Sequence, residues 1–354
     1  MRRGLMLWRE QELSAADVKA RQQRLEGAMK AAGLDAFLVY TNHVRSAGVT
    51  YLTGFTPYWS DALLLILPGQ SPLFSTALSK RVGNWIRSVN PTAEIAHSPK
   101  PGRLIGERLA SAGCKCVGVL ELDRLPAGLA EEIASAADVE LLDGTEVFAS
   151  VRAKPDSAEL GLVRRADALV LEALGTVDPA SRHAGQAVAA LERVAREAGA
   201  EECYIAIAPH LDRDTRPGRF GGAELGRSFA VRLSLAYNGV WVRRTRTFSR
   251  DAALQEQVQS LERAFAALAP KLDPVSPLGP QLKGLAAGAD LARWFLEAPS
   301  GTLPLTEVAS EDRDTGCRVP YGVLSAAFML GGTTVLLGGP VGLDLLPNAT
   351  EEAA

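Results

Sequence analysis

The segment from His210 to Arg250 concentrates the side chains of this chain that could do chemistry. It holds nine arginines against three acidic residues, a local net charge of +6 in a chain whose formal net charge is −3. Histidine is the side chain that titrates closest to neutral pH, so His210 is a candidate general base. The excess of arginine predicts that an anionic ligand, or acidic residues from elsewhere in the chain, balances this segment.

Arg232 and Arg243 stand in two predicted strands, residues 228–236 and 239–248, which meet at Asn238-Gly239. This dipeptide between two such strands predicts a β-hairpin, because both turn positions tolerate positive φ. We therefore expect the two arginines on adjacent strands, where they would repel unless an anion or an acidic segment lay between them. A carboxylate or phosphate on a ligand would fit. The acidic alternatives are Glu311, Asp312 and Asp314.

Length and composition place these residues in an ordinary globular protein. A chain of 354 residues, 47% hydrophobic and 22% charged, is expected to form about two domains. Its net charge gives no reason to expect nucleic acid or a membrane surface as a partner. Glu10 and Glu12 arrive before any long apolar run, and no run reaches about 18 apolar residues, so a cytoplasmic protein is expected. The four scattered cysteines indicate neither a disulfide framework nor a zinc site.

The first 150 residues alternate between short apolar runs and helical patterns. Residues 14–32 have helical spacing, with Ser14 as N-cap and Gly33 ending the helix. Strands that alternate with helices predict an α/β domain with a sheet buried on both faces. The predicted strands are 36–40, 63–67, 72–75, 117–120 and 139–142, and further helices are 102–112 and 125–137.

The polar segment 151–159 contains Pro155 and predicts a domain boundary near residue 150. Beyond it, helices come in separate runs beside strands, which favours an α+β domain with one face of a curved sheet covered by helices. The predicted helices are 157–176, 183–198 and 251–269, and the predicted strands are 203–208, 228–236, 239–248 and 333–338.

Several motifs occur in a characteristic order along the chain. They are Gly33-Leu-Asp-Ala-Phe-Leu-Val39, Tyr51-Leu-Thr-Gly-Phe55, the boundary residues Arg152, Lys154 and Glu159, and Gly239-Val-Trp-Val-Arg-Arg-Thr-Arg-Thr-Phe248. Together they resemble the creatinase, aminopeptidase P and prolidase family (M24). The resemblance implies a creatinase-type α/β domain over 1–150 and an α+β pita-bread domain over 151–354. That second domain is shortened at its C-terminal end, and about the last sixty residues match least well.

The positions of the family's metal ligands differ in this chain. The resemblance puts the two aspartate ligands of the hairpin at Arg232 and Arg243, the histidine ligand at Cys317 and one glutamate ligand near Gly338. A guanidinium has no acceptor and carries a permanent positive charge, so it cannot coordinate a divalent ion. We therefore predict no dinuclear metal site and no cofactor. As a nucleophile, Cys317 would need a base, which its neighbours in the sequence do not supply.

Creatinase hydrolyses a C–N bond without metal, and the resemblance implies a similar reaction here. In this hypothesis the chain is a metal-independent hydrolase of a small anionic nitrogen compound, with His210 as base and Arg232 and Arg243 binding the anion. Thr245 stands where creatinase has a glutamate for the cationic end of its substrate, which argues against creatine. One alternative is an inactive pita-bread protein that binds a ligand or a partner subunit, and another is a metallopeptidase of the Xaa-Pro type.

The motif at Phe55 continues into two further aromatic residues, Tyr58 and Trp59. The resemblance implies a homodimer in which this loop reaches the site of the partner subunit, so these three residues are candidate ligand-binding residues. Packing in the core or at the dimer interface is the alternative. A heteromer with an active relative is the other assembly considered.

Overall fold

The computed structural model describes residues 8–57, 61–90, 92–219, 222–282 and 289–346, so Tyr58 and Trp59 lie outside the described residues. The chain divides into two compact units. The N-terminal unit contains Met6–Ala158 and Pro299–Pro304, and the C-terminal unit contains Glu159–Ala298 and Leu305–Ala354, as far as these residues are described.

The N-terminal unit is built on a six-stranded mixed sheet with the strand order β4-β3-β2-β1-β5-β6. The central strand β1 pairs antiparallel with β2 and parallel with β5. The strands are β1 (Ala36–Thr41), β2 (Ala62–Ile66), β3 (Leu73–Thr76), β4 (Glu94–His97), β5 (Cys116–Leu120) and β6 (Glu140–Asp143). The helices are α1 (Ala15–Ala31), α2 (Ala47–Thr53), α3 (Lys80–Ser88), α4 (Pro101–Ser111), α5 (Ala127–Ala134) and α6 (Thr145–Arg152).

Both faces of this sheet are covered, as the alternation of strands and helices predicts. Side chains alternate along β1, so Phe37 and Val39 join one buried cluster while Leu38 and Tyr40 join another. Ser14 caps α1 as predicted, with its hydroxyl accepting a hydrogen bond from the backbone N–H of Asp17. The α/β class predicted for this part of the chain is confirmed.

The C-terminal unit is built on a seven-stranded sheet with the order β11-β10-β12-β13-β9-β8-β7. The strands are β7 (Glu202–Ala208), β8 (Ser228–Tyr237), β9 (Val240–Ser249), β10 (Ala289–Ser300), β11 (Leu303–Ser310), β12 (Gly322–Leu330) and β13 (Thr333–Val341). The helices are α7 (Ser157–Gly175), α8 (Ala184–Glu197), α9 (Ala252–Leu268) and α10 (Leu278–Leu282). The sequence did not predict β10, β11 or β12, and two of these strands, β10 and β12, carry half of the residues of the site described below.

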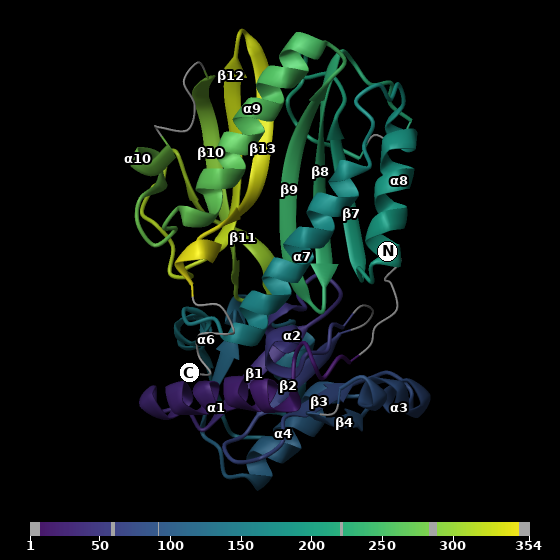
Figure 1. The fold of residues 1–354 in the computed structure, drawn as a ribbon. Coiled ribbons are helices and arrows are strands. Elements are labelled where there is room, and N and C mark those ends of the chain that lie inside the picture. Colours follow the sequence, from purple (N-terminus) through teal and green to yellow (C-terminus); the bar gives the residue numbers. More distant parts are fainter. Residues whose placement is uncertain (1–7, 58–60, 91, 220–221, 283–288, 347–354) are drawn as a thin grey trace. The chain divides into compact units, whose positions relative to one another are not determined.

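Helices α7, α8 and α9 lie along one face of this sheet (Figure 1). Leu261 and Phe265 of α9 pack there against Leu324 and Leu337. Alternate residues of the same strands project from the opposite face, which carries the candidate site. The predicted hairpin between β8 and β9 is confirmed, with Asn238 and Gly239 at φ of 46° and 77°.

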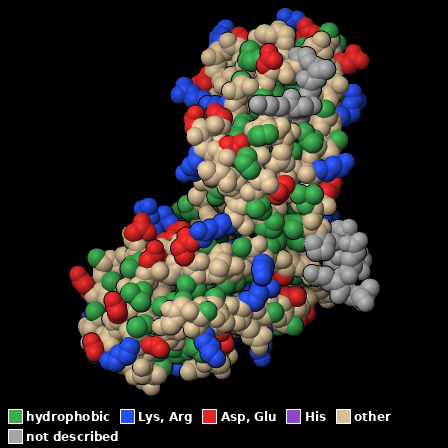
Figure 2. All heavy atoms as spheres, turned by 90° about the vertical axis from the view of Figure 1, so that its left-hand side faces the viewer, with side chains coloured by type: hydrophobic (Ala, Val, Ile, Leu, Met, Phe, Trp, Pro, Cys, Tyr) green, Lys and Arg blue, Asp and Glu red, His purple; other side chains and the backbone are tan. Residues whose placement is uncertain are grey.

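The surface agrees with the nearly balanced composition, because basic and acidic side chains are interspersed over the face shown in Figure 2.

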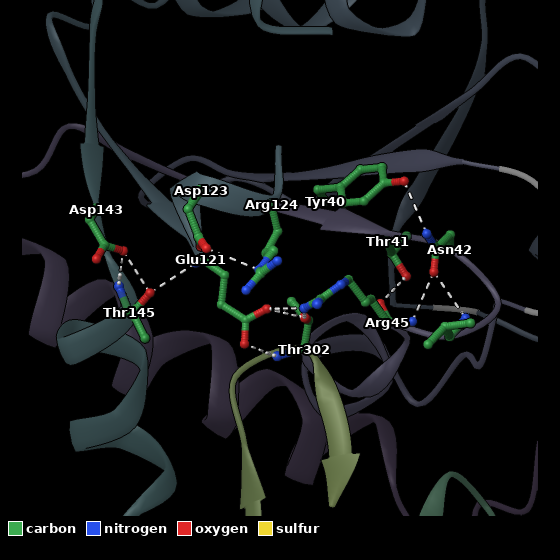
Figure 3. Close-up of polar contacts among 11 residues, drawn as sticks. Tyr40, Thr41, Asn42, Arg45, Glu121, Asp123, Arg124, Asp143, Thr145 and Thr302 are labelled. Carbon is green, nitrogen blue, oxygen red and sulfur yellow. Dashed lines mark hydrogen bonds and ion pairs between the residues drawn. The ribbon is translucent and has the colours of Figure 1, made fainter. Parts of the chain in front are cut away.

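A polar cluster surrounds Glu121 in the N-terminal unit (Figure 3). Glu121 follows β5 with a left-handed φ of 52°, and Arg45 donates a hydrogen bond of 2.5 Å to its carboxylate. The hydroxyl of Thr302 donates to the same carboxylate, and the backbone N–H of Ala47 donates to the carbonyl of Thr302 at 3.0 Å. These contacts place the turn between β10 and β11 in the N-terminal unit.

Gly301→Ala should therefore destabilise the N-terminal unit by about 2–3 kcal/mol. Gly301 has a φ of 58°, and an added Cβ would collide with the Glu121 carboxylate, which Arg45 and Thr302 hold in place. Gly33→Ala is the matched control, because Gly33 has a φ of 70° in the same unit but no atom within 4 Å of the added Cβ. That control should lose only about 1 kcal/mol, from backbone strain. Thermal unfolding of both variants checks the prediction, and equal losses would contradict the contact with Glu121.

Candidate functional site

One row of paired residues crosses the sheet of the C-terminal unit on the face opposite its helices. Arg232 on β8 lies opposite Thr245 on β9, and Thr245 lies opposite Gly338 on β13. Gly338 lies opposite Ser325 on β12, and Ser325 lies opposite Phe295 on β10. Directly paired residues project from the same face of a sheet. Because Gly338 has no side chain, the row is hollow at its centre.

A cavity of about 40 Å³ lies along this row. Its polar groups are two guanidinium groups, from Arg232 and Arg293, and two hydroxyl groups, from Thr245 and Ser325. The rest of the wall is apolar, contributed by Pro217, Phe295, Ala326, Ala327, Leu336 and Leu337. A few polar groups converging in an otherwise apolar pocket are typical of a small-molecule site.

Arg232 has no hydrogen-bond or ion-pair partner among the residues that the structure describes. Burial lowers the pKa of its guanidinium and the charge of Arg243 lowers it further, while Glu297 opposes this effect. Arginine still keeps its proton at neutral pH. The cavity therefore contains a half-buried positive charge without a direct counter-ion among the described side chains.

Arg243 forms an ion pair with Glu297 of β10. Its Nε also donates a 2.8 Å hydrogen bond to the hydroxyl of Ser234. The side chains of Arg243 and Glu297 are 18% and 13% exposed, so the pair is largely desolvated. Arg232 and Arg243 thus lie on adjacent strands and the same face, but only Arg232 lines the cavity.

The acids proposed from the sequence to balance the two arginines were the wrong ones. Glu311 accepts a hydrogen bond from the backbone N–H of Trp294, and Asp314 accepts from the backbone N–H groups of Leu278 and Gly279. These two carboxylates are therefore engaged by backbone N–H groups and not by the two arginines. Glu297, which the sequence reasoning missed, is the acid that pairs with Arg243.

Six of the nine arginines between residues 213 and 250 form ion pairs within the described structure. Two pairs use acids of the segment itself, and the others use acids of α7, α9, β10 and the residue preceding α9. The pairs are Arg213–Asp212, Arg216–Asp214, Arg227–Asp251, Arg243–Glu297, Arg244–Asp167 and Arg246–Glu262. Acidic residues from elsewhere in the chain therefore balance most of the local charge, and Arg232 is not part of that balance.

His210 lies beyond the end of β7 and is not among the residues that line the cavity. It is in bridge pairing with Asp214. Its ring packs on Gly226, where an added Cβ would lie 2.5 Å from Nδ1. Ala206 is the cross-strand partner of Arg232, and His210 is four residues further along, about 13 Å at the rise of a β-strand. The structure does not bring His210 and Arg232 together.

Phe55 is 2% exposed and belongs to the core of the N-terminal unit. Its ring makes edge contacts with Phe74 and Trp85, at centroid distances of 5.7 Å and 6.1 Å. Burial to this extent leaves the ring no exposed face with which to contact a ligand.

The donor set of this face does not suit a pair of divalent metal ions. No three His, Cys, Asp or Glu side chains gather as metal ligands within the described part of the chain. The side chains of Arg232 and Arg243 offer no metal-binding atom, Gly338 has no side chain, and the Glu297 carboxylate is engaged by Arg243.

Cys317 packs against the core beneath the helices, and its Sγ donates to the carbonyl of Val319 at 2.8 Å. Burial raises the pKa of this thiol to about 11, which makes it a poor nucleophile at neutral pH.

The two sheets and their helices define the class of fold. The chain is similar to the X-Pro aminopeptidase from Thermotoga maritima MSB8, with a TM-score of 0.67, 16% identity and coverage of 92% of this chain and 98% of that one. It is similar to the prolidase from Pyrococcus horikoshii OT3, with a TM-score of 0.64, 16% identity and coverage of 93% and 99%. For the dipeptidase PepE from Mycobacterium ulcerans the values are 0.63, 14%, 95% and 98%. At these identities the likeness establishes the pita-bread fold of prolidases and aminopeptidase P.

The N-terminal part can be identified more closely. Residues 21–154 match the family model of the Creatinase/Prolidase N-terminal domain, so this part of the chain is such a domain. The resemblance deduced from the motifs is thereby confirmed at the level of fold and N-terminal domain. The sequence matches no curated protein. Within the described residues, no helix is long and apolar enough to cross a membrane.

Proposed function

We propose that this chain is a ligand-binding member of the pita-bread fold that works without a dinuclear metal centre and binds a small anion in the cavity beside Arg232. The observation that carries the proposal is the unpartnered guanidinium of Arg232 in a cavity that also holds two hydroxyl groups. A desolvated cation next to hydrogen-bond donors attracts an anion that can accept from all of them. Arg243 supports the site indirectly, because it pairs with Glu297 and so leaves that carboxylate unavailable to Arg232.

The lining favours binding over hydrolysis of the creatinase type. Hydrolysis needs a group that accepts and returns a proton within hydrogen-bond reach of the substrate. None of the described residues that line the cavity is a histidine, an aspartate, a glutamate or a cysteine. His210 is about 13 Å along the sheet from the row of Arg232, at the rise of a β-strand. A ligand-binding protein needs none of these proton-transfer groups.

The proposal is tested by titrating the protein with sodium formate, acetate and phosphate at constant ionic strength, followed by NMR chemical shifts. At least one of these anions should bind saturably, and Arg232→Gln should weaken its binding at least tenfold, the effect of losing a charged hydrogen bond. Arg216→Gln is the control, because Arg216 is exposed and pairs with Asp214. Equal binding by all three proteins would refute the anion site. Two tightly held Mn²⁺ ions per chain, found by ICP-MS after incubation and dialysis, would refute the metal-free site.

A further inference from the structure

The hydroxyl of Ser325 is buried in the cavity wall. The side chain is 8% exposed, and its Oγ has no hydrogen-bond partner among the described residues. Ser325 lies opposite Gly338, so the neighbouring strand β13 has no side chain directly facing it. A buried hydroxyl without a partner is destabilising, and native structures retain such groups chiefly where something else satisfies them. Ser325 therefore indicates that the cavity takes a ligand with a hydrogen-bonding atom at this depth.

The size of the cavity limits that ligand. One water molecule requires about 10–15 Å³ of such space, so a cavity of about 40 Å³ has room for roughly three atoms of that size. The volume of a carboxylate with one or two further carbon atoms is of the same order as this space. A larger ligand would have to extend along the open side of the sheet.

The walls also limit the charge of the ligand. Leu336 and Ala327 form a buried apolar cluster with Ala208, Leu211 and Ala230, and Phe295 flanks the same cavity. Placing a second negative charge against such walls would be costly, whereas a short alkyl group would bury apolar surface favourably. Arg232 is half-buried and Arg293 is exposed, so only one of the two cations is partly desolvated. This matches a ligand with one anionic group.

We infer that the ligand is a monocarboxylate with a short apolar substituent, and that Ser325, Thr245 and Arg293 bind it together with Arg232. This inference rests on the proposed anion site and names its ligand class. A carboxylate has two oxygens and about four lone-pair positions, which match the guanidinium and the two hydroxyl donors. The alkyl group then contacts Leu336, Ala327 and Phe295.

The test compares propionate with propionamide, which has the same shape but no charge, and with inorganic phosphate. Isothermal titration or NMR should show propionate binding at least tenfold more tightly than either of the other two. Ser325→Ala should weaken propionate about tenfold, since it removes a donor to a charged group. Ser260→Ala, on the exposed surface of α9, should leave the affinity unchanged.

The melting temperature distinguishes a ligand-binding serine from one whose hydroxyl stabilises the fold, because replacing the latter by alanine would lower the melting temperature. Ser325→Ala removes a buried hydroxyl that has no protein partner, so its melting temperature without ligand should be equal to or higher than that of the wild type. If phosphate bound in a manner dependent on Arg232 and propionate bound no better, the carboxylate inference would be wrong while the anion site stood. If propionamide bound as tightly as propionate, the inference would also be wrong. If no anion bound in a manner dependent on Arg232, both proposals would be wrong.

Discussion

Glu297→Gln should lower the stability of the C-terminal unit by about 2–3 kcal/mol and strengthen anion binding in the neighbouring cavity about tenfold. The variant removes the carboxylate that pairs with Arg243, and Glu297 also acts electrostatically on Arg232. Two partly desolvated guanidinium groups then lie on adjacent strands without that counter-charge. The loss falls below the roughly 3–5 kcal/mol of a fully buried broken pair because both side chains keep some exposure.

The decisive measurement is urea unfolding of Glu297→Gln with and without sodium formate at constant ionic strength. Formate should restore part of the lost stability, because an anion that binds only the folded state stabilises that state. Glu262→Gln is the matched control, since Glu262 pairs with Arg246, a residue of β9 that does not line the cavity. This control should lose less stability and show no formate-dependent recovery beyond that of the wild type. Equal recovery in both variants would mean that Glu297 does not influence the cavity.

The hairpin and the placement of Arg232 could be predicted because the signals are local. Asn238-Gly239 fixes a two-residue turn, and the turn fixes the register of β8 against β9. With side chains alternating every second residue, Arg232 and Arg243 must then share a face. The same alternation places Arg244 on the opposite face, where it pairs with Asp167 of α7.

The partner of Arg243 could not be predicted, because it depends on contacts between distant strands. Glu297 follows Arg243 by more than fifty residues and lies on β10, whose pairing with β12 shifts register between Leu291 and Arg293. This irregularity interrupts the strict alternation by which a strand is recognised in a sequence. The cavity depends in the same way on β13 lying beside β9, which places Gly338 opposite Thr245.

Of the site residues suggested by the sequence, Arg232 lines the cavity, whereas His210 and Phe55 do not, and this difference has a physical reason. Arg232 belongs to a regular strand, so its face and neighbours follow from the register. His210 stands beyond the end of β7, where strand alternation no longer fixes its direction. Phe55 comes two residues after the end of α2, and an aromatic ring at this position serves core packing as well as it would serve ligand binding. The spacing of the motifs therefore predicted the position of a side chain on a strand better than that of a side chain outside the strands.

Asp156→Asn should destabilise the N-terminal unit by about 3–4 kcal/mol. Arg21 of α1 is 4% exposed and donates hydrogen bonds of 2.7 Å and 2.8 Å to the two carboxylate oxygens of Asp156. Its remaining partners include the carbonyl of Tyr51 at 3.2 Å and the ring of Tyr51. An amide at position 156 keeps one acceptor but removes the negative charge that faces the buried guanidinium.

Thermal unfolding of Asp156→Asn beside Asp138→Asn separates burial from the mere presence of an ion pair. Asp138 is fully exposed and pairs with Lys115 at 2.9 Å, so that variant should melt at the wild-type temperature, because exposed pairs contribute little. Asp156 lies in the polar segment that the sequence marked as a boundary, yet its carboxylate holds α1 through Arg21. An Asp156→Asn protein as stable as the wild type would show that the other contacts of Arg21, the Tyr51 ring and carbonyl among them, are enough to solvate its guanidinium. A large loss confined to this variant would show instead that the boundary segment is an integral part of the N-terminal core.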